Sequence, residues 1–166
     1  MPEPVLGIDF GRVIEGGLGA DEAADTSFLG STLEDAVASP ATPGVFEVLP
    51  RLVDMFGGRA WIISKCGVQT QLKTLAWLDR HDFYRRTGLP SSNVRFCRER
   101  TDKATHCREL GVTHMIDDRI DVHAAIRDVV PHLYLFGPQD GEIPDWVVHV
   151  PDWPATARRI ASDFTG

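Results

Sequence analysis

The sequence predicts an α/β protein with a doubly wound, mainly parallel sheet. Short apolar runs, of the kind that form strands buried on both faces, alternate along the chain with segments of helical periodicity. Polar residues end several of these runs, as expected where parallel strands reach one edge of a sheet. The length of 166 residues suits one domain, and we treat residues 1–166 as a single unit.

The first half of the chain contains two predicted strands and two predicted helices. Residues 5–8 form an apolar run before Asp9, and residues 60–63 form another before Ser64. Between them, residues 45–56 carry apolar side chains at helical spacing and are followed by a Gly-Gly stop signal. The next helix is expected to bury an apolar stripe made of Leu72, Leu75 and Ala76.

The same alternation continues through the second half of the chain. Apolar runs predict strands at residues 94–96, 113–116, 132–136 and 147–150. Helical patterns lie at residues 101–110, at residues 121–129 and behind Pro154. Strands that alternate with helices favour a parallel sheet covered on both faces.

Residues 15–41 interrupt this pattern. They are rich in Gly, Ala, Ser and Asp and hold few large apolar side chains, among them Phe28, Leu29, Leu33 and Val37. We expect this segment to form a flap or minimal cap over one end of the sheet rather than a second domain.

Composition excludes several classes of protein. A net charge of −7, from 17 basic and 24 acidic residues, argues against nucleic acid as a partner. The apolar runs are too short to span a bilayer, so no membrane association is expected. Cys66, Cys97 and Cys107 are odd in number and lack C-x-x-C spacing, and we see no signal peptide, which favours reduced thiols in the cytoplasm.

Polar residues that carry chemistry gather at the predicted carboxyl edge of the sheet. Asp9, Ser64 and the pair Asp117 and Asp118 each follow an apolar run, and Lys103 lies in the first turn of a predicted helix. Each aspartate taken singly is more often a helix cap or turn former, so the functional interpretation depends on their coincidence. Clustered carboxylates repel one another unless a cation joins them, and hard oxygen ligands suit Mg²⁺. A lysine in a first helical turn opposes the helix dipole, which indicates an anionic ligand.

At these residues the sequence resembles the haloacid dehalogenase-like (HAD) hydrolase superfamily, most of whose members are Mg²⁺-dependent phosphatases with a Rossmann-like fold. The resemblance covers nearly the whole chain and rests on the order and spacing of four short motifs. They are residues 5–14, residues 62–64, Lys103 and residues 115–118.

The resemblance implies a role for each residue. Asp9 would be the nucleophile that becomes aspartyl-phosphate, while Ser64 and Lys103 hold the phosphoryl oxygens and Lys65 adds positive potential. The Mg²⁺ ligands would be Asp9, the backbone carbonyl of Gly11, and Asp118 with help from Asp117. Phosphoryl transfer needs an in-line nucleophile and positive charge around the equatorial oxygens, which this set supplies.

Gly11 is a departure from the family pattern. The phosphatases usually carry a second aspartate there, which protonates the leaving oxygen and contributes about 10² to 10⁴ in rate. Three outcomes fit this change. Glu15 or Asp21 in the flap supplies the acid, the substrate has a leaving group that needs no proton, or the protein binds Mg²⁺ and phosphate without turnover.

We therefore expect a phosphohydrolase acting on a phosphomonoester or an activated phosphate, with a nucleotide or sugar phosphate among the open choices. The alternative is a weakly active or inactive domain that binds Mg²⁺ and phosphate as a regulatory or interaction module. A dehalogenase proper also lacks the second aspartate, but it needs a larger helical cap than residues 15–41 provide. Neither the substrate nor the oligomeric state can be read from the residues.

Overall fold

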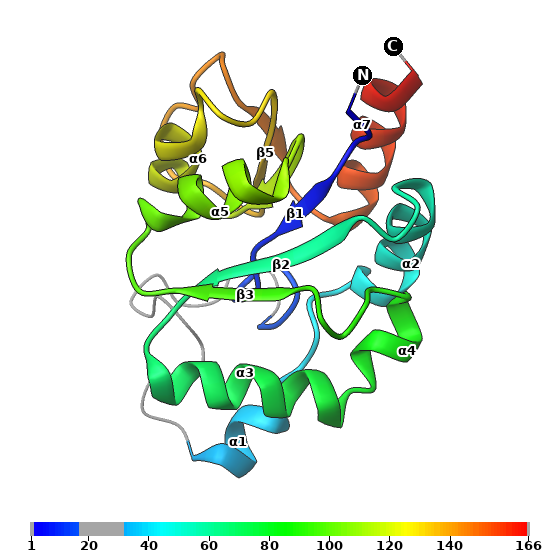
Figure 1. Ribbon diagram of the computed structural model, residues 1–166, viewed down its shortest axis with the longest axis vertical. Coiled ribbons are helices and arrows are strands. Elements are labelled where there is room, and N and C mark those ends of the chain that lie inside the picture. The colour runs from blue at the N-terminus through cyan, green and yellow to red at the C-terminus, as the bar shows by residue number, and fades with distance from the viewer. Residues whose placement is uncertain (1, 17–31, 166) are drawn as a thin grey trace.

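The computed structural model describes residues 2–16 and 32–165, and within these ranges it shows six strands and seven helices (Figure 1). The strands are β1 (Leu6–Ile8), β2 (Ala60–Lys65), β3 (Val94–Cys97), β4 (His114–Asp117), β5 (His132–Phe136) and β6 (Val148–Val150). The helices are α1 (Leu33–Val37), α2 (Val45–Met55), α3 (Val68–Arg80), α4 (Phe83–Thr87), α5 (Asp102–Leu110), α6 (Ile120–Ile126) and α7 (Trp153–Thr165).

The strands form one sheet in the order β3-β2-β1-β4-β5-β6, and each neighbouring pair in it is parallel. The predicted α/β class with a doubly wound sheet is thus confirmed. The strand order reverses between β1 and β4, where Leu6 pairs with His114 and Ile8 with Ile116. This is the topological switch point at which open α/β sheets bind their ligands.

Helices cover both faces of the sheet, and each face has its own core (Figure 1). Side chains of β1 such as Leu6 and Ile8 pack on one face with residues of α2, α3, α4 and α7. Met115 and Ile63 point to the other face, where α5 and α6 contribute Cys107 and Ile126. This alternation follows from the two-residue period of a strand, which sends successive side chains to opposite faces.

The expected apolar stripe of α3 is wrong. Leu72 and Leu75 are exposed, and the buried face is made of Thr74, Trp77 and Leu78. Both sets fit helical spacing, but the large Trp77 ring packs edge-on against Phe10 and donates from Nε1 to the Ser39 carbonyl, 2.9 Å away. Tertiary packing of this aromatic side chain therefore decides which face turns inward.

Helix α1 lies within the segment interpreted as a flap. Thr32 caps it by accepting a hydrogen bond from the Asp35 N–H at 3.1 Å, and α1 packs against α3. A backbone bridge between Glu15 and Ala41 joins the two ends of the segment, and Glu15 also forms a bridge to Gly11 in the preceding loop. Leu33 is exposed rather than buried. Phe28 and Leu29 lie outside the described residues, and the flap as a unit stays a prediction.

The sequence also led to expectations about the cysteines and about membrane-spanning segments. All three cysteines are free, in agreement with the predicted reduced thiols, and all three are also buried. No helix in the described ranges has the length and hydropathy that a membrane crossing requires.

The buried ring of His114, at the start of β4, makes stability depend on pH. Burial, reinforced by the neighbouring His132, lowers the pKa of His114 to about 4 from 6.5. Between these values the unfolded chain binds the proton and the folded chain does not, so the free energy of unfolding falls as pH drops from 6.5 to 4. The full change is on the order of 3 kcal/mol.

Urea unfolding across this pH range measures the effect. His114→Asn keeps a polar group beside the Thr113 hydroxyl, which lies 2.7 Å from His114 Nδ1. The asparagine side chain does not titrate in this pH range. We expect a smaller loss of stability between pH 6.5 and pH 4 in the variant than in the wild type. Equal losses would show that the proton is taken up elsewhere.

Candidate active site

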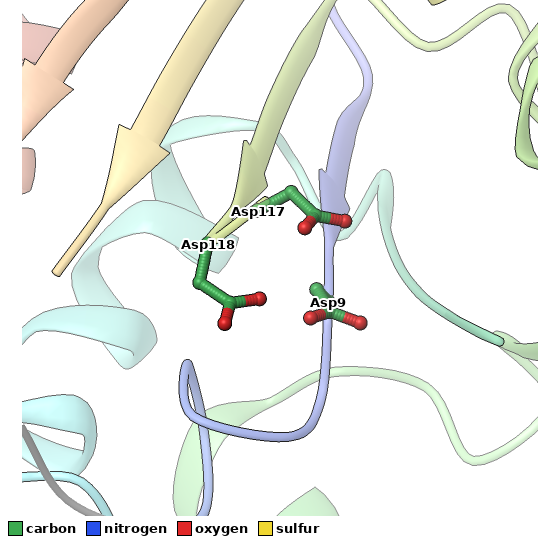
Figure 2. Close-up of side chains that lie close together, drawn as sticks. All are labelled: Asp9, Asp117 and Asp118. Carbon is green, nitrogen blue, oxygen red and sulfur yellow. The ribbon is translucent and has the colours of Figure 1, made fainter. Parts of the chain in front are cut away.

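The candidate site lies at the carboxyl ends of β1 and β4, at the switch point of the sheet. Asp9 directly follows β1, Asp117 is the last residue of β4, and Asp118 comes next (Figure 2). The Asp9 backbone N–H still donates to the Ile116 carbonyl at 2.9 Å, so the ladder between the two strands extends into the site. Two central strands therefore fix the backbone positions of these acids.

Lys103 reaches this cluster from the first turn of α5, which begins at Asp102. Its side chain is only 2% exposed, and Nζ donates to Asp9 Oδ1 at 3.0 Å and to Asp117 Oδ2 at 2.7 Å. Burial alone would lower the pKa of Lys103, but the two carboxylates outweigh burial and raise it. Lys103 is therefore a permanent cation in the floor of the site.

Asp117 is wholly buried and has both carboxylate oxygens engaged by protein donors. Oδ2 accepts from Lys103, and Oδ1 accepts from the Arg119 backbone N–H at 3.0 Å. His123 Nε2 lies 3.0 Å from the Asp117 carbonyl oxygen and holds the backbone as well. This environment makes Asp117 a positioning residue for Lys103, and its place among metal ligands stays a prediction.

The carboxyl groups of Asp118 and Asp9 are turned toward each other (Figure 2). Carboxylate oxygens of Asp9, Asp117 and Asp118 lie within 4.8 Å of one another. Burial and the nearby Asp9 raise the pKa of Asp118 to about 9, and burial together with Asp117 raises the pKa of Asp9. Two carboxyl groups that resist ionisation together are stabilised by a shared cation, and a hard oxygen donor set fits Mg²⁺. Asp9 and Asp118 are the residues best placed to hold it.

A pocket of about 200 Å³ opens above these acids. It is lined by Asp9, Gly11, Ser64, Lys65, Cys66, Gly67, Thr70, Arg100, Lys103, Asp118, Arg119 and Val122. The structure thus brings the residues singled out from the sequence together in one cavity, with the buried Asp117 directly behind it. Ser64, near the end of β2, is 6% exposed and faces the same space as Asp9.

Sequence reasoning missed two polar residues of this pocket. Arg119 follows Asp118 directly, and its adjacency to the acidic pair was a usable signal. Thr70 lies in the first turn of α3, three residues after Gly67, and nothing in its sequence context distinguished it from an ordinary helical residue.

Gly11, Arg12 and Glu15 lie in the loop that follows β1 and Asp9. Arg12 adopts a left-handed backbone conformation with φ of 64°, whereas Gly11 does not have a positive φ. The carboxyl group of Glu15 is buried and accepts a hydrogen bond from the Ser39 hydroxyl. Asp21, the other residue considered as a replacement acid, lies outside the described residues.

Comparisons with known proteins support the fold. No protein-family model matches the chain, and no curated protein matches it in sequence. Among solved structures, the chain is similar to a provisionally assigned haloacid dehalogenase-like hydrolase from Burkholderia xenovorans LB400, with a TM-score of 0.63 and 14% identity. The match covers 97% of this chain and 98% of that one. The likeness shows that the chain has the haloacid dehalogenase-like fold.

The acidic pair Asp9 and Asp118 should set the affinity for Mg²⁺. We expect Mg²⁺ to raise the melting temperature of the wild type, because a ligand that binds only the folded state stabilises it. Asp118→Asn removes a charged oxygen donor and should weaken Mg²⁺ binding at least about tenfold, measured by titration calorimetry.

Asp128→Asn is the matched control for this experiment. Asp128 lies ten residues further along the chain, beyond the end of α6, is exposed, and does not line the pocket. Its substitution should leave Mg²⁺ affinity unchanged. Equal weakening by both substitutions would indicate a general effect of negative charge and would place the ion elsewhere.

Proposed function

We propose that the protein is a Mg²⁺-dependent phosphohydrolase that works through an aspartyl-phosphate on Asp9. The observation that carries this proposal is the environment of Asp9. Its carboxyl group lies in a pocket at the switch point, accepts a hydrogen bond from the buried Lys103, and faces Asp118. A nucleophile, a fixed cation and a second acid in one cavity are the parts that phosphoryl transfer requires.

The protein's own residues would act in two steps. An Asp9 oxygen attacks phosphorus, a new O–P bond forms, and the bond to the leaving oxygen breaks. Water then attacks phosphorus and releases inorganic phosphate, which regenerates the Asp9 carboxylate. Lys103 and Ser64 would hold the phosphoryl oxygens, with Lys65 adding positive charge at the mouth. Bound Mg²⁺, held by Asp9 and Asp118, would supply further charge stabilisation.

Gly11 constrains the substrate. It lines the pocket but has no side chain to protonate a leaving oxygen. A substrate whose leaving group is stable as an anion, such as an acyl phosphate or an aryl phosphate, needs no such proton.

The lack of an acidic side chain at Gly11 also favours a second candidate function. A domain with the cation site and the phosphate site but without the acid could bind Mg²⁺ and a phosphorylated ligand and release nothing. Such a domain would serve as a regulatory or interaction module, and a broad panel of phosphate esters and anhydrides separates it from an enzyme.

Asp9→Asn tests the nucleophile. An amide cannot form the aspartyl-phosphate, so phosphate release should fall by at least about 10³-fold, measured by phosphate detection with and without Mg²⁺. Asp79→Asn, on the exposed surface of α3, is the control and should retain the wild-type rate. If Asp9→Asn turns over at the wild-type rate, another group is the nucleophile.

Gly11→Asp tests the departure from the family pattern. Because the backbone at Gly11 is not left-handed, an aspartate meets no conformational penalty from φ there. We expect turnover of alkyl phosphates to rise about tenfold and that of aryl phosphates to change little, since only the alkoxide needs a proton.

Circular dichroism and thermal melting show whether this variant is folded. A wild-type enzyme that already hydrolyses alkyl and aryl phosphates at similar rates would contradict this prediction, because another group would then supply the proton.

A further inference from the structure

Asp118 lies one residue beyond the sheet, and a side chain from another loop holds its backbone. β4 ends at Asp117, which pairs with Leu135 of β5, so Asp118 lies outside the ladder that these two strands form. Gln139 Nε2 donates to the Asp118 carbonyl oxygen at 2.9 Å and to the carbonyl oxygen of Phe136, the last residue of β5, at 3.1 Å. The Gln139 amide therefore joins the carboxyl ends of β4 and β5 beyond the end of their ladder.

The orientation of the Gln139 amide follows from its two partners. Both are carbonyl oxygens, which accept hydrogen bonds and cannot donate them. The amide NH₂ group has two hydrogens, so it can serve both oxygens at once. An ionised carboxylate or an apolar side chain at this position could not make either contact.

The turn that carries Gln139 is itself restrained. Gly137 directly follows β5 and has a φ of 85°, which glycine adopts without strain, and the ring of Pro138 fixes the next φ. The Gly137 N–H donates to the Val150 carbonyl at 3.0 Å, and His149 Nε2 lies 2.7 Å from the Gly137 carbonyl oxygen. Gln139 thus extends from a short turn that is tied to β6.

This restraint acts on one of the two acids best placed to hold Mg²⁺. The carboxyl group of Asp118 is turned toward that of Asp9 (Figure 2). The backbone of Asp9 is held by its N–H bond to Ile116, whereas the Asp118 carbonyl is held by the Gln139 side chain. Gln139 does not line the pocket, so it reaches the cation site only through the Asp118 backbone.

We propose that Gln139 is a positioning residue of the cation site, which sets the preference for Mg²⁺ over Ca²⁺ by fixing the Asp118 main chain. The inference rests on the proposed function, because it takes Asp118 as a Mg²⁺ ligand. Mg²⁺ requires nearly ideal octahedral geometry at about 2.0 to 2.1 Å, whereas Ca²⁺ accepts longer and more variable distances. Groups that orient a metal ligand without touching the ion typically change metal affinity by about 10- to 100-fold. A site whose ligand can shift therefore loses more affinity for Mg²⁺ than for Ca²⁺.

Gln139→Met tests the inference, because it removes both hydrogen bonds and keeps the length of the side chain. Titration calorimetry with MgCl₂ and CaCl₂ should show Mg²⁺ affinity falling about tenfold and Ca²⁺ affinity falling about threefold or less. The change in ion preference is the decisive readout, since a general loss of stability does not distinguish the two ions. Gln139→Ala, which is too small to crowd the turn, should give the same result and serves if the methionine variant does not fold.

Asn93→Leu is the matched control. Asn93 Nδ2 donates to the Ala60 carbonyl at 3.0 Å, so this variant also removes a hydrogen bond from a side-chain amide to a backbone carbonyl. Asn93 precedes β3 and Ala60 begins β2, which places the pair at the edge of the sheet opposite the site. The melting temperature should fall, while the affinities for Mg²⁺ and Ca²⁺ should equal those of the wild type.

The outcomes separate this inference from the proposed function. Unchanged affinities or equal losses for the two ions in the Gln139 variants, or the same change of preference in Asn93→Leu, overturn the inference even if the protein hydrolyses phosphate esters. A selective loss of Mg²⁺ affinity in the Gln139 variants supports it, even if no ester in the panel is hydrolysed. A wild type that binds neither ion overturns the inference together with the Mg²⁺ dependence of the proposed function. Melting temperatures measured without metal verify that each variant is folded.

Discussion

The buried ion pairs of Lys103 with Asp9 and Asp117 are the constraint on which the rest of the structure depends. Ions removed from water are stable only when they are paired and hydrogen-bonded. Lys103 meets this condition only if the first turn of α5 lies against the ends of β1 and β4. The same contact fixes the nucleophile candidate and the helix that supplies its cation. Removal of the Lys103 ammonium group would leave the Asp9 and Asp117 carboxyl groups without their cationic partner.

The sequence predicted the strands and the acids well because both depend on local patterns. Apolar runs marked the strands, and the polar residues that end them, Asp9 and Ser64, fall in one pocket. Helix α3 was predicted with the wrong face, since Leu72 and Trp77 both fit helical spacing and only packing chooses between them. Helix α4 was missed because five residues are too few for a periodic signal.

The different surroundings of Asp117 and Asp118 do not follow from the residue pattern, and only the family resemblance distinguished the two, giving Asp118 as a Mg²⁺ ligand with help from Asp117. Adjacent residues at the end of a strand point in opposite directions, so one meets Lys103 behind the pocket and the other faces Asp9. From the residue pattern alone, either aspartate of the pair could be the one that contacts Lys103. The register of β4 against β1 decides it, because it places Ile116 beside Ile8. One buried acid then organises the site while its neighbour is available for chemistry.

The hydrogen bond from the Asp9 amide to the Ile116 carbonyl has a consequence for the dynamics of the protein. Core strands open only in the least frequent native-state fluctuations, and their amides exchange with solvent most slowly. The Asp9 carboxyl group belongs to the same residue as such an amide rather than to a loop that fluctuates independently. Its position is therefore lost only when the centre of the sheet opens, so heat should disrupt the acidic cluster and unfold the molecule in a single cooperative event.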